Sequence, residues 1–185
     1  MKRIIKYLSP IFSIYKLNLY KIDKNSPPLI DSSMSSGVKC ELEEISYDNY
    51  KLAYTIDKES KLDFKSMLKD GDSGVFAFVD GRPVGYLWLK KDGSNDPFFD
   101  FENCCYLCRG FVHPDYRGRR LLNMMIKYLV DKYRDLYQDF YVAIAPTNIS
   151  SIKSCQKVNI KYLRTFVFVR CLRVTFNKYT IKNEI

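Results

Sequence analysis

The chain has 185 residues, which is enough for one domain with a hydrophobic core of its own. Hydrophobic residues make up 46% of it, so disorder is not expected, and the net charge of +9 predicts attraction to polyanions such as nucleic acid, anionic lipid heads or phosphorylated cofactors. No run approaches the roughly 20 apolar residues that span a bilayer, and no secretory signal is convincing. We therefore interpret the six cysteines as reduced thiols of a cytoplasmic protein.

Residues 1–37 are interpreted as an N-terminal extension that begins with a basic and apolar stretch. The apolar residues of 4–15 are spaced to line one face of a short helix, whereas those of 17–22 fall among polar residues, as in a strand. Two interpretations follow: the stretch makes a weak contact with an anionic membrane surface, or it packs on the domain. Pro10 interrupts a long amphipathic helix and so favours packing.

The first part of the main domain, 38–185, has the pattern of a sheet interrupted by two helices. A strand, two helices and then three strands are expected at 38–46, 46–57, 58–69, 75–79, 84–89 and 103–112. The dipeptide Asp80-Gly81 is a strong hairpin signal between the second and third of these strands.

The second part of the domain alternates helices and strands. Apolar residues at helical spacing predict a helix over 120–136, followed by a compact apolar strand over 140–145. A short helix over 148–158 and one long strand or two over 162–174 complete the pattern. This order predicts an α+β fold.

The most informative segment is the turn from Phe111 to Leu122, in which a strand ends and a helix begins after a run of basic residues. Such a turn brings backbone N–H groups, a helix N-terminus and arginines to one point. This combination binds phosphate, because unpaired N–H groups donate to the anion and arginine adds planar, charged donors. The segment therefore predicts a site for a ligand that carries a pyrophosphate; a solvated basic loop is the alternative.

The same segment resembles the acyl-CoA-binding loop of the GNAT superfamily of N-acetyltransferases, which reads R/Q-x-x-G-x-G/A. Arg117 matches its first position, whereas Arg120 stands where the family has Gly and Leu122 where it has Gly or Ala. A small residue at the last position would let phosphate oxygens approach the backbone. We expect that Leu122 turns into the core and that Arg119 and Arg120 replace some backbone contacts with side-chain charge.

A second segment, residues 148–160, resembles the family signature N-x-x-(A/S)-x-x-x-Y-x-K-x-G-F. The matching residues are Asn148, Ser151 and Lys157. Asn159 replaces Gly, and Cys155 occupies the position of the Tyr. Two matches in the right order are more specific than either alone, and the resemblance covers about residues 38–175.

The resemblance implies a mixed, mainly antiparallel central sheet flanked by helices, here with an extra N-terminal basic segment. It also implies that the fourth and fifth strands of the family splay apart, and that acetyl-CoA lies along the exposed edge. The N–H of Val112 would then polarise the thioester carbonyl. The residues expected to bind the cofactor are Phe111, Val112, Arg117, Gly118, Arg119, Arg120, Leu121 and Asn148.

Two residues are candidates for proton transfer. In family members the Tyr protonates the departing thiolate, so Cys155 is the candidate acid, although a packed thiol with water as the acid is the favoured alternative. Glu102, with Asp100 nearby, is the candidate base for the attacking amine, although an ordinary solvated turn is the favoured alternative. The lone His113 lies beside the cofactor loop, which argues for a surface role.

The cluster Cys104-Cys105-x-x-Cys108 is interpreted as core packing rather than as a metal site, because adjacent strand residues point to opposite faces. The expected function is therefore an acyl-CoA-dependent N-acyltransferase that acetylates a primary amine of a small molecule. A non-catalytic domain of the same fold that binds CoA or another polyanion is the alternative. A nucleic-acid or membrane-binding module is a third possibility, but no nucleic-acid motif accompanies the basic charge, so nucleic acid is not an expected partner.

Overall fold

The computed structural model of the protein describes residues 12–24, 39–91, 103–171 and 174–181. Its strands are β1 (Phe12–Ile22), β2 (Cys40–Glu44), β3 (Ser73–Val79), β4 (Arg82–Lys91), β5 (Cys104–Val112), β6 (Asp139–Ile144), β7 (Ile160–Cys171) and β8 (Val174–Ile181). Its helices are α2 (Leu52–Ile56), α3 (Phe64–Lys69), a 3-10 turn (Pro114–Tyr116), α4 (Leu121–Tyr133) and α5 (Ile149–Gln156).

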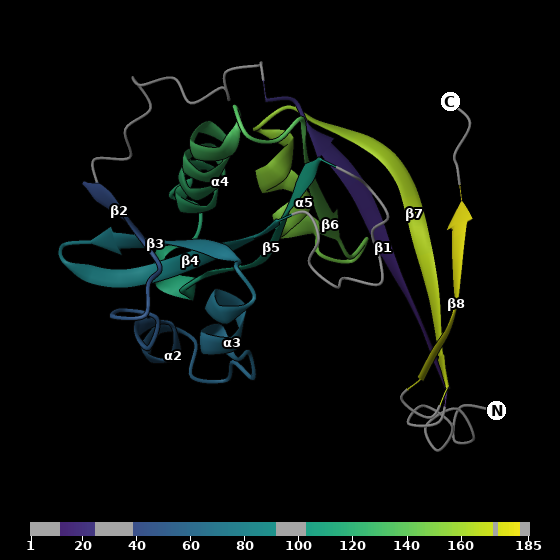
Figure 1. Cartoon of the computed structure of the whole chain (residues 1–185), viewed down its shortest axis with the longest axis horizontal. Coiled ribbons are helices and arrows are strands. Elements are labelled where there is room, and N and C mark those ends of the chain that lie inside the picture. Colours follow the sequence, from purple (N-terminus) through teal and green to yellow (C-terminus); the bar gives the residue numbers. More distant parts are fainter. Residues whose placement is uncertain (1–11, 25–38, 92–102, 172–173, 182–185) are drawn as a thin grey trace.

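The described strands form one mixed sheet in the order β2-β3-β4-β5-β6-β1-β7-β8 (Figure 1). Strands β5 and β6 are parallel, and the other neighbours pair antiparallel. The expected α+β class, with a mainly antiparallel sheet flanked by helices, is thus confirmed.

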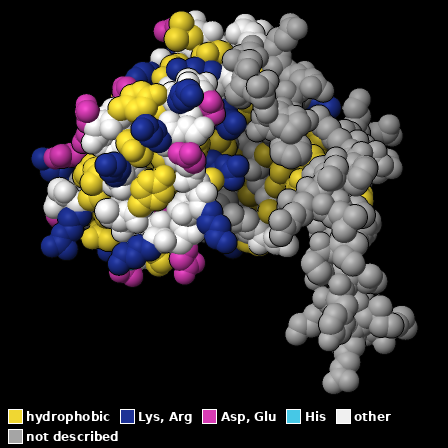
Figure 2. All heavy atoms as spheres, turned by 60° about the horizontal axis from the view of Figure 1, so that its bottom comes forward, with side chains coloured by type: hydrophobic (Ala, Val, Ile, Leu, Met, Phe, Trp, Pro, Cys, Tyr) yellow, Lys and Arg dark blue, Asp and Glu magenta, His cyan; other side chains and the backbone are white. Residues whose placement is uncertain are grey.

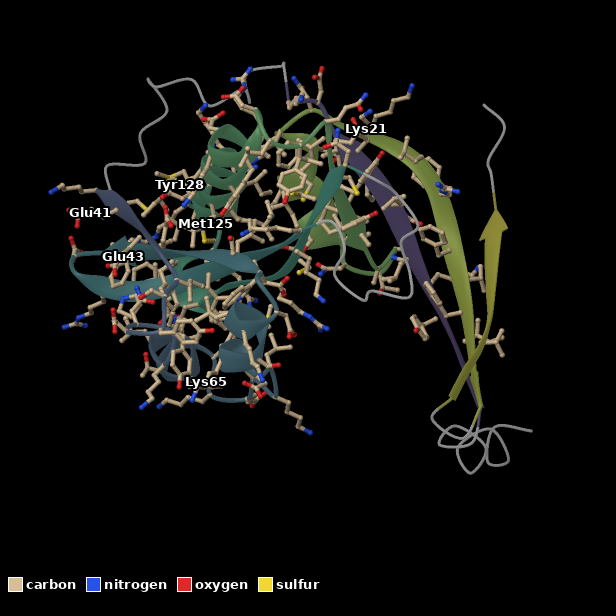
Figure 3. All side chains as sticks on the ribbon, in the orientation of Figure 1. Lys21, Glu41, Glu43, Lys65, Met125 and Tyr128 are labelled. Atoms are coloured by element: carbon tan, nitrogen blue, oxygen red, sulfur yellow. The ribbon has the colours of Figure 1, made fainter. Side chains whose placement is uncertain are left out.

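Helices cover both faces of the sheet (Figure 1). Successive side chains of β3 alternate between the two layers: Val75 and Ala77 pack in the cluster that contains α4, whereas Phe76 packs in the cluster under α2 and α3. Met125 of α4 points at the sheet and is fully buried (Figure 3). Trp88 of β4 is the largest fully buried side chain of the opposite layer.

The N-terminal segment contributes β1 to the interior of the sheet. This strand lies between β6 and β7, and its pairing with β7 runs from Phe12 to Ile22. Residues 12–15, which helical spacing had included in a short helix, are therefore part of a strand, because their backbone groups pair with a distant strand. The earlier part of that expected helix, and with it the expected membrane contact, lies outside the described residues.

Short-range sequence signals predicted the β3–β4 hairpin turn and the presence, though not the start, of α3. Asp80 and Gly81 both have positive φ, 50° and 71°, as a two-residue hairpin turn of this composition requires. The second inserted helix begins at Phe64 rather than near residue 58, because the Asp63 side chain accepts a hydrogen bond from the N–H of Ser66 at 3.0 Å and caps the helix there.

Two irregularities of β5 open the sheet. Tyr86 pairs with Phe111 and Trp88 with Cys108, so Arg109 and Gly110 together face the single residue Leu87 in a β-bulge. On its other side β5 pairs with β6 only from Cys104 to Leu107, and the remainder of its edge has no partner strand among the described residues. The fourth and fifth strands of the family core correspond to β5 and β6, which separate as expected.

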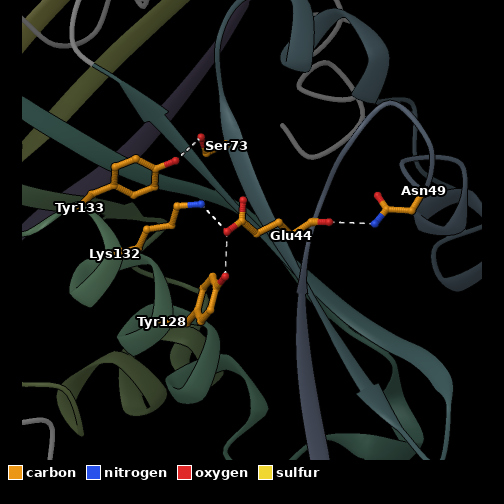
Figure 4. A network of polar contacts seen from close by, with 6 residues as sticks. All are labelled: Glu44, Asn49, Ser73, Tyr128, Lys132 and Tyr133. Carbon is orange, nitrogen blue, oxygen red and sulfur yellow. Dashed lines mark hydrogen bonds and ion pairs between the residues drawn. The ribbon is translucent and has the colours of Figure 1, made fainter.

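Near the C-terminal end of α4, Glu44 of the edge strand β2 contacts side chains of the helix (Figure 4). Its carboxylate accepts a hydrogen bond from the Tyr128 hydroxyl at 2.9 Å and forms an ion pair with Lys132. The hydrogen bond from Lys132 is the main reason why the pKa of the Glu44 carboxyl is lowered. Glu41 and Glu43, by contrast, lie on the exposed outer part of β2 (Figure 3).

We expect the Glu44 contacts to stabilise the fold only while this carboxyl is ionised. Its folded pKa lies below the ordinary value of 4.5, so the stabilisation is present above that pH and is lost as the pH falls through the folded pKa. The side chain is 53% exposed, which limits the contribution to about 0.2–1 kcal/mol. In urea unfolding, Glu44→Gln should be less stable than wild type at neutral pH and should approach wild type at an acid pH below the folded pKa of Glu44.

The control for this prediction is Glu59→Gln, because Glu59 is exposed and forms no ion pair among the described residues. It should unfold like wild type at both pH values. A loss in Glu44→Gln that is the same at both pH values would assign the effect to packing instead of charge.

Candidate functional site

A hollow of about 270 Å³ lies between the N-terminus of α4 and the helix α5, and we call it the α4 hollow. Its cationic lining residues are Arg117, Arg120 and Lys157. The rest of the wall consists of two asparagines, three serines, Gly118, Tyr116, the first residues of α4 and the end of β5. The hollow therefore combines positive charge, hydroxyl groups and a helix N-terminus, which is the chemistry that holds phosphate.

A second hollow of about 300 Å³, the strand gap, lies where β5 and β6 separate. Apolar side chains line most of it, among them Leu107, Val142 and Ile144. It shares Gly110, Leu122, Asn148 and Ser151 with the α4 hollow, so the two are continuous. Together they form a path from the basic helix end to the unpaired edge of β5.

The N-terminus of α4 has no side-chain cap. Arg120 precedes the helix, and its side chain does not cap it, so the first N–H groups of α4, beginning with that of Leu121, have no acceptor within the helix. Gly118 has a φ of 79°, a conformation that suits glycine. Arg117 is held in place because its Nε donates to the carbonyl oxygen of Val112 at 3.1 Å.

The edge of β5 presents a backbone donor to the strand gap. The N–H of His113 donates to the carbonyl of Val84 on β4 at 2.8 Å. Because the N–H groups of successive strand residues point to opposite sides, the N–H of Val112 faces the gap. This orientation is the one expected for a donor to the thioester oxygen.

The opposite wall is fixed by two hydrogen bonds. The side-chain oxygen of Asn148 accepts from the N–H of Ser151 at 3.1 Å and caps α5. The side-chain amide of Asn123, which is 3% exposed, donates to the carbonyl of Ser154 at 2.7 Å and joins α4 to α5. Asn148 therefore shapes both hollows while it holds the helix that forms their wall.

Leu122 occupies the border between the two hollows and is half-buried against the core around α4. A Cβ atom on Gly110 would lie 3.0 Å from Leu87 Cδ1 and 3.3 Å from Leu122 Cδ1. Because Gly110 has no side chain, the Leu122 side chain has room beside it. The Gly or Ala that the family has at the position of Leu122 would not need this room.

Two residues beside the loop do not line either hollow. Arg119 lies over the ring of Tyr116, 5.0 Å from its centroid, and donates to the carbonyl of Asp115 at 3.3 Å. His113 packs edge-on against the same tyrosine at 6.1 Å. The structure thus brings together all the expected cofactor residues except Arg119.

Cys155 lies in the wall of the strand gap and is 2% exposed. Burial raises the pKa of its thiol to about 12. A thiol with so high a pKa stays protonated, but its proton would pass uphill to a CoA thiolate of ordinary pKa. Glu102 and Asp100, the candidate bases, lie outside the described residues.

Cys104 and Cys105 are both buried, and they pack in different core clusters. Their side chains therefore diverge, as their adjacent positions on a strand predict. In the part of the chain that the structure describes, no group of three His, Cys, Asp or Glu side chains is placed to hold a metal ion.

None of the described helices has both the length and the apolar character needed to cross a membrane.

Sequence reasoning missed Lys157 and Ser154 as lining residues of the α4 hollow. The signature match had singled out Lys157 without giving it a role, and Lys157 follows α5 directly, three residues after Ser154. The bulge residue Arg109 was also missed, because the left-handed backbone falls on the arginine and not on the neighbouring Gly110.

The protein has an α+β fold in which two strands of the sheet separate beside a basic helix N-terminus. This arrangement suits a phosphorylated ligand that lies along the edge of a strand. The model of the Acetyltransferase (GNAT) family matches residues 40–159. This match covers more than half of the chain, so the protein belongs to the GNAT acetyltransferase family, for which acetyl-CoA is the acyl donor. A comparison with curated proteins gave no match.

Solved structures share the fold at low sequence identity. A functionally unknown conserved protein from Staphylococcus epidermidis superposes with a TM-score of 0.62 and 12% identity over 91% of this chain and 64% of its own. A putative GNAT acetyltransferase from Novosphingobium aromaticivorans superposes with a TM-score of 0.64 and 12% identity over 85% of this chain and 63% of its own. The chain thus spans slightly less than two thirds of the length of each of these two proteins.

The aminoglycoside N-acetyltransferase AAC(6')-Iy, solved in complex with CoA, superposes with a TM-score of 0.55 and 18% identity. This match covers 65% of the present chain and 91% of the other. The residues of the α4 hollow fit the same cofactor, because its three cations and free helix N–H groups match the charge of phosphates.

Proposed function

We propose that the protein transfers an acetyl group from acetyl-CoA to a primary amine of a small molecule. The observation that supports this most is the continuity of the α4 hollow with the strand gap. A phosphate-binding end leads there to a narrow apolar path along an unpaired strand edge. A ligand with a charged head and an uncharged, amide-containing arm matches both parts.

Each part of the path has a role in this proposal. Arg117, Gly118, Arg120 and the N–H of Leu121 hold the diphosphate, while Phe111 and Val112 offer backbone groups to the arm. The N–H of Val112 donates to the thioester oxygen and stabilises the negative charge that develops there. Acetyl-CoA supplies the acyl group, and holding the amine against its carbonyl supplies much of the remaining rate.

The protein as purified should release CoA thiol from acetyl-CoA only when a suitable primary amine is present, with one N-acetyl product for each thiol released. A panel of amino sugars, amino acids and polyamines, with mass detection of products, tests this expectation. Binding of CoA without acyl transfer to any amine would favour the non-catalytic CoA-binding domain instead. Arg120 and Leu122 in place of small residues, and Cys155 in place of Tyr, are the observations that favour that alternative.

Cys155 is proposed to line the strand gap, with water protonating the departing thiolate. Cys155→Ala should therefore leave kcat within about threefold of wild type and should not change the pH profile of kcat. A loss of the alkaline limb of that profile, together with a larger fall in kcat, would make the thiol the general acid after all.

Lys157 is proposed to meet the 3′-phosphate of the cofactor, because it faces the diphosphate-binding arginines across the α4 hollow. Lys157→Gln should weaken CoA binding about tenfold and leave the affinity for dephospho-CoA unchanged, as measured by calorimetry. Lys153→Gln is the matched control, since Lys153 is exposed on the same helix and does not line the hollow. An equal loss for both ligands would assign Lys157 to the diphosphate.

A further inference from the structure

Among the residues that the structure describes, five other than glycine have a positive φ: Asp80, Asn103, Arg109, Arg120 and Asn159. Asp and Asn adopt this left-handed conformation readily, whereas a long side chain is disfavoured in it. The two arginines are therefore the unusual members of the set. Arg120 lines the α4 hollow and Arg109 lines the strand gap, so both unfavourable positions lie on the path proposed for the cofactor.

Arg109 lies at the bulge that separates the two halves of β5, with a φ of 51°. Its side chain is exposed, and within the described ranges it forms no ion pair and no hydrogen bond. A G1-type bulge takes a glycine at this position by preference. Backbone strain held at the mouth of a site points to a functional role for the side chain.

The positive charge of Arg109 lies close enough to act on Tyr86, which packs on the face of the sheet that carries α2 and α3. On that face the Tyr86 hydroxyl donates to the carboxylate of Asp57 at 2.9 Å. Burial and Asp57 raise the pKa of Tyr86, whereas the positive charge of Arg109 acts on it in the opposite direction. Arg109 is thus close to this pair without forming an ion pair with Asp57, and its charge stays available.

Figure 2 shows the face that carries α2 and α3, where basic side chains are scattered among hydrophobic and acidic ones. The described portion of this face carries no continuous basic patch, so Arg109 is not part of a wider surface for polyanions. Its role is therefore local to the mouth of the strand gap.

The charges of the cofactor lie at the other end of the path. Its diphosphate and 3′-phosphate belong to the α4 hollow, whereas the arm and the thioester that would fill the strand gap are uncharged. An anion at Arg109 must therefore come from the second substrate. We propose that Arg109 binds a carboxylate or phosphate group of the acceptor, so that the acceptor is an amine that also carries a negative charge. This inference rests on the proposed acetyltransferase function.

Matched pairs of amines test the proposal on the complex of the full chain with CoA. Phosphoethanolamine is compared with ethanolamine, and glycine with glycinamide, so that each pair differs by one anionic group and the two pairs separate phosphate from carboxylate. In calorimetry the anionic member of at least one pair should bind about tenfold more tightly than its neutral partner. Arg109→Asn should abolish this preference, and Arg82→Gln, on the remote hairpin, should retain it.

The choice of Asn separates function from folding. Because Asn tolerates the left-handed backbone, Arg109→Asn should melt at the same temperature as wild type or higher while its anion preference is lost. In turnover, kcat/KM should fall for the anionic acceptors and stay unchanged for the neutral ones.

Three results would overturn the inference. Equal binding of both members of every pair, or binding of neither, excludes an anion site at Arg109. An equal fall of kcat for charged and neutral acceptors in Arg109→Asn would assign the guanidinium to the thioester oxygen. A different result would contradict the proposed function itself, namely that the protein releases no CoA thiol from acetyl-CoA with any amine.

Discussion

Arg117→Glu is expected to weaken CoA binding by about 100-fold or more, which is about 2.7 kcal/mol. Arg117 lines the α4 hollow beside the free N–H groups of α4, where a diphosphate would lie. A hydrogen bond to a charged group contributes about 1.5–3 kcal/mol, and the new carboxylate adds repulsion to the loss of that bond. Calorimetry with CoA, supported by circular dichroism to verify the fold, measures the effect.

The sharpest control for this prediction is two residues away. Arg119→Glu makes the same change in net charge, but Arg119 lies over Tyr116 and does not line the hollow. Its effect should be about tenfold or less and should shrink as salt is added, because it acts only through long-range charge. Equal losses in the two variants would mean that the loop attracts CoA without a defined contact to Arg117.

Trp88→Ala is expected to cost about 3–5 kcal/mol of the free energy of unfolding, the largest effect on stability that we predict. Trp88 is completely buried, stacks on Phe64 at 5.8 Å, and lies against the space that a side chain on Gly74 would occupy. Its removal leaves a cavity between the sheet and α3 next to the β4–β5 pairing that sets the bulge. Chemical unfolding followed by circular dichroism measures the loss, since Trp88 is the single tryptophan of the chain.

Trp88→Phe is the matched variant. It keeps an aromatic ring against Phe64 and removes the indole N–H, which is buried with no hydrogen-bond partner among the described residues. Its cost should stay below about 1.5 kcal/mol, because the lost volume is partly offset by the removal of an unpaired donor. A Trp88→Ala variant as stable as Trp88→Phe would show that the helices under the sheet repack freely.

Local patterns in the sequence predicted most elements of this fold. The helical spacing of apolar residues marked α4, and Asp80-Gly81 marked the β3–β4 hairpin, because both depend on residues close in the sequence. The turn that we propose to bind phosphate could likewise be predicted from the strand, the basic residues and the helix that follow one another between Val112 and Leu122.

The place of β1 could not be predicted in this way. Its partners in the sheet are residues 140–144 and 160–171, more than a hundred positions away, and a strand pattern alone does not name its neighbours. The β-bulge at Arg109 was missed for a related reason. It arises from the mismatch of two paired strands, and the residue that adopts the left-handed backbone there is not one that favours it.

The most direct test of the account is the structure of the protein in complex with acetyl-CoA. We predict a diphosphate within hydrogen-bonding distance of the N–H groups from Gly118 to Leu121 and of the Arg117 guanidinium. The arm should follow the free edge of β5, with the thioester oxygen at the N–H of Val112. A cofactor bound anywhere other than the α4 hollow and the strand gap, or none bound at saturating concentration, would contradict the account.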